Sequence, residues 1–252
     1  MKKCRYGLDD VMRLWPHHTM KKQSIVSNSG PQVIVLASGK GGVGKSTLAR
    51  ALAGHWLSLG RNPAVIDADP QASIASLHDN DGPMKNLVIV ADPQMETIAA
   101  SIAELRTQHD VVVVDTAGFR NQTTIIAAVA ADLVLVPLKP AAEDVREAVA
   151  MVDLIGELNR TPERSGRPIL VAMVMTMVTP GTLIARQVRK ELEKSGYPLF
   201  EAEIAQRVAF PECSMRGLVP SVTEPDGAAA RDIGRLAIEI GKMGGAHNVE
   251  AA

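Results

Sequence analysis

One eight-residue segment constrains this chain more than any other feature. Residues 39–46 read Gly-Lys-Gly-Gly-Val-Gly-Lys-Ser and follow directly after the apolar run at 33–37. The segment fits the pattern of a glycine, four residues and then Gly-Lys-Ser/Thr, in which the backbone N–H groups of a loop surround phosphate oxygens. Glycines are needed there because a Cβ would crowd the bound anion. The sequence therefore predicts a P-loop between a buried strand and a helix.

The side chains of this loop have distinct predicted roles. We expect Lys45 to reach the β- and γ-phosphates of a nucleotide and the Ser46 hydroxyl to bind Mg²⁺. The helix that starts here points its positive end at the phosphates. The nucleotide-binding residues predicted in the loop are Lys40, Gly41, Gly42, Val43, Gly44, Lys45, Ser46 and Thr47.

Short apolar runs alternate with helical patterns along the rest of the chain. Strands are predicted at 33–37, 64–67, 87–90, 111–115, 133–137, 169–175 and 199–204. Helices are predicted after Lys45 and around 95–106, 144–158, 183–194 and 228–240. Many of the strand runs are apolar throughout, as expected for parallel strands buried on both faces. The pattern predicts an α/β fold, a doubly wound, mostly parallel sheet flanked by helices, with ligands at the carboxyl ends of the strands.

Two predicted strands end in acidic residues. Asp67 and Asp69 follow the apolar run at 64–66, and Asp115 ends the run at 111–114. The first pair would lie near the phosphates if its strand neighbours the P-loop strand. Asp115 has the Walker B form, an aspartate at the end of an apolar strand that holds Mg²⁺ directly or through water.

The lysine at position 40 is not required by the minimal P-loop pattern. A loop of the form K-G-G-x-G-K-S/T is the deviant Walker A motif, and with it the chain resembles the ParA/MinD superfamily of P-loop ATPases. The resemblance implies that Lys40 crosses a dimer interface to the nucleotide bound by the partner subunit. There it would stabilise charge on the transferring phosphoryl group, as an arginine finger does.

The segment Asp67-Ala68-Asp69-Pro70-Gln71 is similar to the DxDPQ box of ParA proteins. That similarity implies that Asp69 orients the attacking water and that Asp67 supports the magnesium shell. The predicted catalytic residues are then Lys40, Lys45 and Asp69, and the predicted metal-binding residues are Ser46, Asp67 and Asp115.

Further segments narrow the resemblance to ParA-type plasmid and chromosome partition ATPases. Residues 136–140 are similar to a proline-containing strand end of that group, and Thr176 and Met177 match the strand end near the base. Residues 204–214 resemble a loop of the family with several departures, so no adenine contact is assigned there. The resemblance spans about residues 32–242. It implies ATP and Mg²⁺ as cofactors and a homodimer that forms on ATP binding.

The implied function is DNA partition. The ATP-bound sandwich dimer would bind double-stranded DNA without sequence preference and hydrolyse ATP when a centromere-binding ParB-type adaptor stimulates it. We expect such a protein in the cytoplasm, associated with the nucleoid. A ParA-like ATPase that positions another cargo, such as a carboxysome, a chemoreceptor array or a transfer complex, stays open because no residue separates it from a partition ATPase.

Two other functions are disfavoured by what the sequence lacks. A MinD-like membrane-associated division-site ATPase needs a C-terminal amphipathic helix, and residues 242–252 hold no aromatic anchor. We therefore expect no membrane partner. An iron–sulfur reductase that shares the loop would need cluster-binding cysteines, and the two present, Cys4 and Cys213, do not supply them.

The overall charge gives no support for DNA binding. The chain holds 27 Lys and Arg against 28 Asp and Glu, which excludes a wholly basic nucleic-acid binder. Any DNA contact must come from a local patch, and residues 181–216 are slightly basic. The DNA-binding candidates in that segment are Arg186, Arg189, Lys190, Arg207 and Arg216.

The two ends of the chain differ from its middle. Residues 1–31 form a predicted basic arm in which Leu8, Val11, Met12 and Trp15 share one helical face, followed by a linker. This arm either docks on the surface of the protein or contacts DNA, a partner or a second subunit. Residues 32–243 are the predicted ParA-like ATPase domain, and residues 244–252 are a tail.

Overall fold

The computed structural model describes residues 30–77, 81–118, 121–164 and 166–243. The helix expected within residues 1–31 and the tail at 244–252 lie outside the described residues. Within the described ranges, no helix has the length and apolar character needed to cross a membrane.

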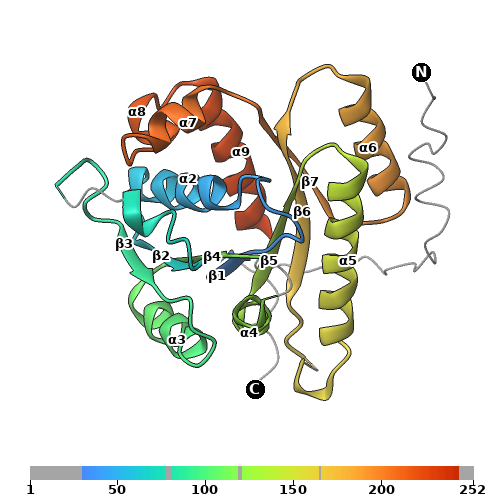
Figure 1. Cartoon of the computed structure of the whole chain (residues 1–252), viewed down its shortest axis with the longest axis horizontal. Coiled ribbons are helices and arrows are strands. Elements are labelled where there is room, and N and C mark those ends of the chain that lie inside the picture. Colours follow the sequence, from blue (N-terminus) through green and yellow to red (C-terminus); the bar gives the residue numbers. More distant parts are fainter. Residues whose placement is uncertain (1–29, 78–80, 119–120, 165, 244–252) are drawn as a thin grey trace.

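A single parallel sheet organises the described part of the chain (Figure 1). Its seven strands lie in the order β3-β2-β4-β1-β5-β6-β7, and every neighbouring pair runs parallel. The strands are β1 (Val33–Leu36), β2 (Pro63–Ala68), β3 (Val88–Ala91), β4 (Val111–Thr116), β5 (Leu133–Leu138), β6 (Leu170–Val178) and β7 (Leu199–Ala205). The predicted doubly wound α/β fold is confirmed, and the strand ranges match to within a few residues.

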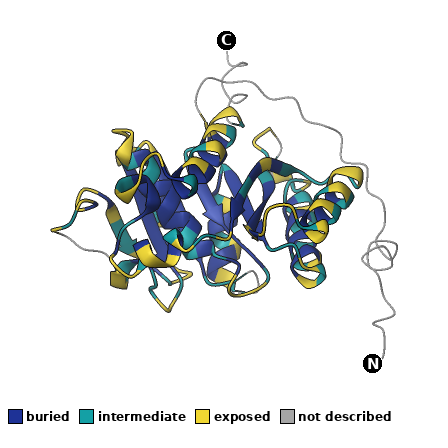
Figure 2. Cartoon of the chain, turned by 90° about the horizontal axis from the view of Figure 1, so that it is seen from above, coloured by how far each residue is buried: buried dark blue, intermediate teal, exposed yellow. Residues whose placement is uncertain are grey.

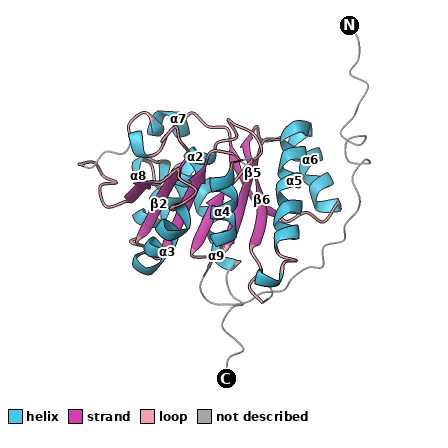
Figure 3. Cartoon of the chain, turned by 60° about the horizontal axis from the view of Figure 1, so that its bottom comes forward, coloured by secondary structure: helices cyan, strands magenta, loops and turns pink. Residues whose placement is uncertain are grey.

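Helices cover both faces of this sheet (Figure 3). One apolar core lies under α3 (Ile98–Gln108), α4 (Gln122–Ala130), α5 (Ala142–Leu158) and α6 (Leu183–Lys194). The other lies under α2 (Lys45–Ser58), α7 (Ala209–Ser214), α8 (Pro220–Thr223) and α9 (Ala228–Lys242). Figure 2 shows the result, with buried strands in the centre and exposed residues on the outer faces of the helices. Because β1, β2, β4 and β5 are buried at every position, their sequences are apolar without alternation, except for the buried polar residues at the carboxyl ends of β2 and β4.

The sequence did not predict α4, α7 and α8. The α4 segment holds alanine, threonine and isoleucine without a charged face, so its sequence lacks the periodicity of an amphipathic helix. Its start is fixed by Asn121, whose side chain accepts a hydrogen bond from the Thr123 backbone N–H. The other two helices have six and four residues, too short for a periodic pattern.

Candidate nucleotide-binding site

The P-loop connects β1 to α2 at the carboxyl edge of the sheet. Gly42 and Gly44 have φ angles of 73° and 89°, in the left-handed region that favours glycine. Gly44 occupies the N-cap position of α2 and offers no side-chain cap. The first backbone N–H groups of this helix are therefore free to bind an anion, as the loop pattern predicts.

Lys45 lies on the inner side of the loop. Lys45 is only 7% exposed, and its Nζ donates a hydrogen bond to Ser38 Oγ at 3.1 Å. Burial lowers the pKa of Lys45, while the charges of Asp115 and Asp69 act in the opposite direction. The ammonium group therefore lies within the field of two of the predicted acids, where phosphate oxygens would add further anionic partners.

The strand order brings the acids together by a route that the sequence did not predict. The strand β2 does not neighbour β1, because β4 lies between them. Asp115 of β4 lies in register with Leu36 of β1 on one side and with Asp67 of β2 on the other. The condition stated from sequence, that these two strands are neighbours, is therefore not met, but both carboxylates still reach the edge of the sheet beside the P-loop.

Asp67 and Asp115 are both fully buried, yet their oxygens have different surroundings. Asp67 Oδ2 accepts hydrogen bonds from the backbone N–H groups of Ile74 and Ala75 at 2.8 and 2.9 Å. Neither carboxylate oxygen of Asp115 has a hydrogen-bond partner of good geometry within the described part of the chain, although the Ser46 hydroxyl lies close enough to lower the pKa of this carboxyl. Burial raises the pKa of Asp115 to about 7, against the opposite effects of Ser46 and Lys45. The carboxylate of Asp115 is thus costly to ionise without a further cation.

A magnesium ion fits this arrangement. Mg²⁺ is usually held by one or two carboxylates together with substrate phosphates and water. The unpartnered oxygens of Asp115 lie beside Ser46, the predicted hydroxyl ligand, and a divalent cation would offset their desolvation. Asp67 already accepts backbone hydrogen bonds, so it fits a supporting role behind the metal ligands rather than direct ligation.

Asp69 lies just after the end of β2, in the loop that leads to the Ile74 and Ala75 backbone N–H groups bound by Asp67. Its Oδ1 accepts a hydrogen bond from the Gln71 backbone N–H at 2.9 Å, and its side chain is partly exposed. Its charge acts on both Lys45 and Asp115, which puts it close to the predicted phosphate position. A partly exposed carboxylate at that place can accept a proton or a hydrogen bond from water.

Lys40 occupies a different environment from Lys45. Its Nζ lies 2.5 Å from Glu143 Oε2 and 4.0 Å from Asp144 Oδ2, both at the start of α5. Hydrogen bonding to Glu143 raises the pKa of Lys40, and its side chain is 44% exposed. The two lysines of the P-loop therefore contact different elements of the fold.

A cavity of about 420 Å³ continues the site away from the acids. Its walls are mostly apolar, as in many pockets that hold a flat ring. Thr176 and Met177, the residues predicted to lie near the base, both line it. The remaining lining residues are Val43, Gly44, Thr47, Leu48, Ile204, Ala205, Gln206, Arg207, Val208, Phe210 and Pro211.

Residues at the end of β6 line this cavity and also contact the P-loop. Thr176 Oγ1 donates to the carbonyl oxygens of Val43 at 2.9 Å and Leu138 at 3.2 Å, so the hydroxyl positions the loop. Met177 has a φ of 51°, rare for a residue with a side chain, and its Cε lies 3.5 Å from where a Cβ at Gly44 would be. Sequence reasoning missed the contribution of residues 205–211, for which the partial family resemblance of that loop was the available signal.

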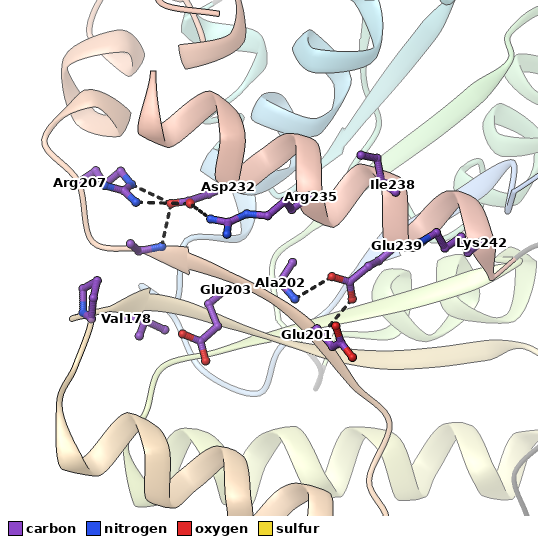
Figure 4. Close-up of a pocket in the computed structure, with 12 residues that line it drawn as sticks. Val178, Glu201, Ala202, Glu203, Arg207, Asp232, Arg235, Ile238, Glu239 and Lys242 are labelled. Atoms are coloured by element: carbon purple, nitrogen blue, oxygen red, sulfur yellow. Dashed lines mark hydrogen bonds and ion pairs between the residues drawn. The ribbon is translucent and has the colours of Figure 1, made fainter. Parts of the chain in front are cut away.

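Arg207 links this cavity to a second one of about 490 Å³ between β7 and α9 (Figure 4). Its Nε lies 2.7 Å from Oδ2 of the buried Asp232, whose other oxygen lies 2.6 Å from Arg235 Nη2. In the same cavity, the Glu239 carboxylate accepts hydrogen bonds from the backbone N–H groups of Glu201 and Ala202 (Figure 4). Arg207 is therefore held in an ion-pair network of α9.

The five DNA-binding candidates fall into two groups. Arg189 pairs with Glu203 and Glu193, and Arg207 pairs with Asp232. The other three are exposed and form no ion pair with any described residue. Arg186 and Lys190 lie on α6, and Arg216 follows α7, helices that pack on opposite faces of the sheet. Their role in DNA binding stays a prediction.

Comparison with known proteins adds to this geometry. The family model described as "CobQ/CobB/MinD/ParA nucleotide binding domain" matches residues 34–221. Protein ParA of Rhizobium radiobacter is 30% identical over 180 residues, which cover 71% of this chain and 80% of that protein. Maintenance of carboxysome distribution protein A of Gloeobacter kilaueensis is 33% identical over 210 residues, which cover 82% of this chain and 90% of that protein.

A solved structure supports the fold independently of close sequence similarity. The septum site-determining protein MinD of Pyrococcus horikoshii, complexed with Mg-ADP, superposes with a TM-score of 0.67. The match covers 84% of this chain and 96% of that one at 14% sequence identity. At that identity the likeness speaks for the fold alone.

Proposed function

The chain belongs to the CobQ/CobB/MinD/ParA nucleotide-binding family, among the ParA/MinD deviant Walker A ATPases, and from that premise we propose that it is a DNA partition ATPase. Two ATP-bound chains pair as a sandwich dimer, and the dimer binds double-stranded DNA without sequence preference. A centromere-binding ParB-type adaptor stimulates hydrolysis and releases the DNA. In a cell the protein would then lie in the cytoplasm on the nucleoid, with residues 32–243 as the ATPase domain.

The observation that carries the ATPase part is the buried, unpartnered carboxylate of Asp115 beside Ser46 and Lys45. Bound Mg²⁺ would supply positive charge between the phosphates, and Ser46 and Asp115 would hold it. Lys45 binds the β- and γ-phosphates, and the apolar cavity beyond Thr176 takes the base. Asp67 keeps the loop of Asp69 in place through its backbone hydrogen bonds.

The reaction itself needs a water aligned with the γ-phosphate and a donor for the charge that develops on it. Asp69 orients the water, since its partly exposed carboxylate lies in the field of Lys45 and Asp115. Lys40 acts on the nucleotide of the partner subunit, because in its own chain it contacts α5 rather than those acids. Hydrolysis therefore depends on assembly.

Carriage of another cargo is the second candidate function. It is favoured by the 33% identity to a protein that is named for carboxysome distribution. The nucleotide cycle would be the same, and only the cargo-bound partner would differ. A deletion strain separates the two: loss of a low-copy replicon supports partition, whereas a misplaced protein assembly with normal replicon inheritance supports the second function.

The direct test is binding to a non-specific DNA duplex with ATP, with ADP and without nucleotide, across a salt series. We expect binding only with ATP, and an affinity that falls steeply with salt because phosphate contacts release counterions. The double variant with Arg186→Ala and Lys190→Ala should bind more weakly than Lys194→Ala, a control on the same helix. Absence of DNA binding in every nucleotide state would contradict the partition mechanism.

A further inference from the structure

The start of α5 carries an acidic cluster that faces the P-loop. Glu143, Asp144 and Glu147 all raise the pKa of Lys40 through their charges, with the hydrogen bond from Lys40 to Glu143 as the largest influence. The contact is close along the loop, because a Cβ at Gly39 would overlap the Glu147 carboxylate. The first residues of the P-loop are therefore packed directly against α5.

Acids in the first turn of a helix are favourable by themselves, because they complement the helix dipole. The dipole does not explain the pairing seen here. Glu143 reaches Lys40 Nζ at 2.5 Å, although both side chains are largely exposed and could separate into water. Asp144 is only 4% exposed, its Oδ1 has no hydrogen-bond partner among the described residues, and Lys40 is the cation that its other oxygen approaches.

We propose that Glu143, supported by Asp144, holds Lys40 on its own chain before assembly and thereby restrains the ATP-dependent pairing of two chains. This inference rests on the proposed function, in which Lys40 must reach the nucleotide of the partner subunit. Each Lys40 has to leave its acids before it can cross the interface. The restraint is overcome only when a nucleotide on the partner offers a stronger set of anionic oxygens.

The restraint would give the cycle a useful direction. Chains without ATP, or with ADP, keep Lys40 on α5 because no γ-phosphate competes with Glu143. Once ATP is present on both chains, the two lysines exchange their intrachain acids for phosphates. Glu143 is in this account a positioning residue, since it acts only through Lys40.

The experiment compares Glu143→Gln with Glu157→Gln, an exposed glutamate on the same helix that forms no ion pair with a described residue. First, the nucleotide-free chain is treated at pH 8 with an acetylating N-hydroxysuccinimide ester. The acetylation rate of Lys40 is read by peptide mass spectrometry relative to that of exposed Lys85. Second, the dimer dissociation constant with a non-hydrolysable ATP analogue and Mg²⁺ is measured by sedimentation.

In Glu143→Gln we expect Lys40 to acetylate faster, by roughly two- to fivefold, as for the loss of one exposed ion pair. The dimer should tighten by roughly three- to tenfold, because two lysines are released together. Glu157→Gln should match the wild type in both measurements. An unchanged acetylation rate in Glu143→Gln would overturn the intrachain contact.

The remaining outcomes separate this inference from the function on which it rests. Faster acetylation together with an unchanged dimer dissociation constant would overturn the restraint, while the partition function would stand. A wild-type chain that stays monomeric with the ATP analogue would contradict the proposed function, and the restraint would fail with it.

Discussion

The two lysines of the P-loop, Lys45 and Lys40, lie in opposite environments. Lys45 is buried beside Asp115 and Asp69, and desolvation lowers its pKa. Lys40, five residues earlier, is 44% exposed, and its contact with Glu143 on α5 raises its pKa. One cation is held inside the site by the sheet, whereas the other is held outside it by a helix.

These two environments fit the proposal that one short loop contacts the nucleotides of two subunits. A buried lysine between acids cannot leave without stranding charge, so Lys45 suits the binding of its own nucleotide. An exposed lysine in a surface ion pair exchanges partners at a much smaller cost than a buried one, so Lys40 suits a contact that forms on assembly against a modest restraint. Variants of the two lysines should therefore fail at different steps of the cycle.

The largest effect is expected for Lys45→Ala. This change removes the cation proposed to bind the phosphates and leaves Asp115 and Asp69 without it, so affinity for ATP should fall by about 10³-fold. Titration with a fluorescent ATP analogue measures the loss, with Lys85→Ala as an exposed control. Normal binding of the analogue by Lys45→Ala would contradict the assignment of Lys45 to the phosphates.

Lys40→Ala should reduce turnover rather than nucleotide binding. We expect nucleotide affinity close to that of the wild type, because Lys40 contacts α5 in its own chain. Turnover should fall by about 10²–10³-fold, the usual cost of removing one preorganised donor to the transition state. Steady-state ATPase rates and the same titration measure the two effects, and wild-type turnover would reduce Lys40 to an ordinary loop lysine.

A smaller effect should separate the two buried acids. Burial raises the folded-state pKa of Asp115 to about 7, above its ordinary value, so stability from this group is full below about pH 4 and is lost as pH rises to 7. In the absence of Mg²⁺ and nucleotide, Asp115→Asn should therefore raise the melting temperature at pH 8 by about 2–6 °C. Near pH 4 the two chains should differ little.

Asp67→Asn is the matched control for that measurement. The Asp67 carboxylate accepts hydrogen bonds from the backbone N–H groups of Ile74 and Ala75. An amide at this position supplies only one acceptor oxygen, whereas the carboxylate supplies two. This variant should melt at a lower temperature than the wild type at pH 8. A lower melting temperature for Asp115→Asn as well would show that Asp115 is satisfied in the free chain.

The smallest expected effect lies at the base end of the site. Met177→Ala removes apolar contact from the cavity, so affinity for ATP should fall by about three- to tenfold. Met215→Ala changes a side chain that is 85% exposed and does not line the cavity, and it should bind ATP like the wild type. Equal affinities in isothermal titration would contradict the assignment of the cavity to the base.

The placement of the P-loop and of the acidic strand ends was predictable because its information is local. The P-loop is contiguous, and the strands that end in Asp67 and Asp115 are short runs buried on both faces, which sequence reveals directly. The order of strands is not local. The insertion of β4 between β1 and β2 follows from packing of the whole sheet, so the sequence could state the adjacency of β1 and β2 only as a condition, and the condition is not met.

The base end was less predictable because distant segments build it. Its cavity joins the P-loop, the end of β6 and residues 204–211, and only Thr176 and Met177 were placed there from sequence. The ion pair of Arg207 with Asp232 spans 25 positions and joins the loop after β7 to α9, which no motif records. The contact of Lys40 with Glu143 spans 103 positions and was missed for the same reason.

A mixing experiment tests whether Lys40 acts on the nucleotide of the partner subunit. Lys40→Ala and Asp69→Ala chains are each expected to be nearly inactive, and they are combined in equal amounts before ATP is added. In a mixed dimer the Lys40→Ala chain keeps its own Asp69 and receives Lys40 from its partner, so one of its two sites is complete.

With random pairing the mixture should hydrolyse ATP at about a quarter of the wild-type rate. If Lys40 serves only its own chain, no site in the mixed dimer is complete. The mixture would then be no faster than the sum of the two separate variants, and that result would rule out the action of Lys40 across the interface.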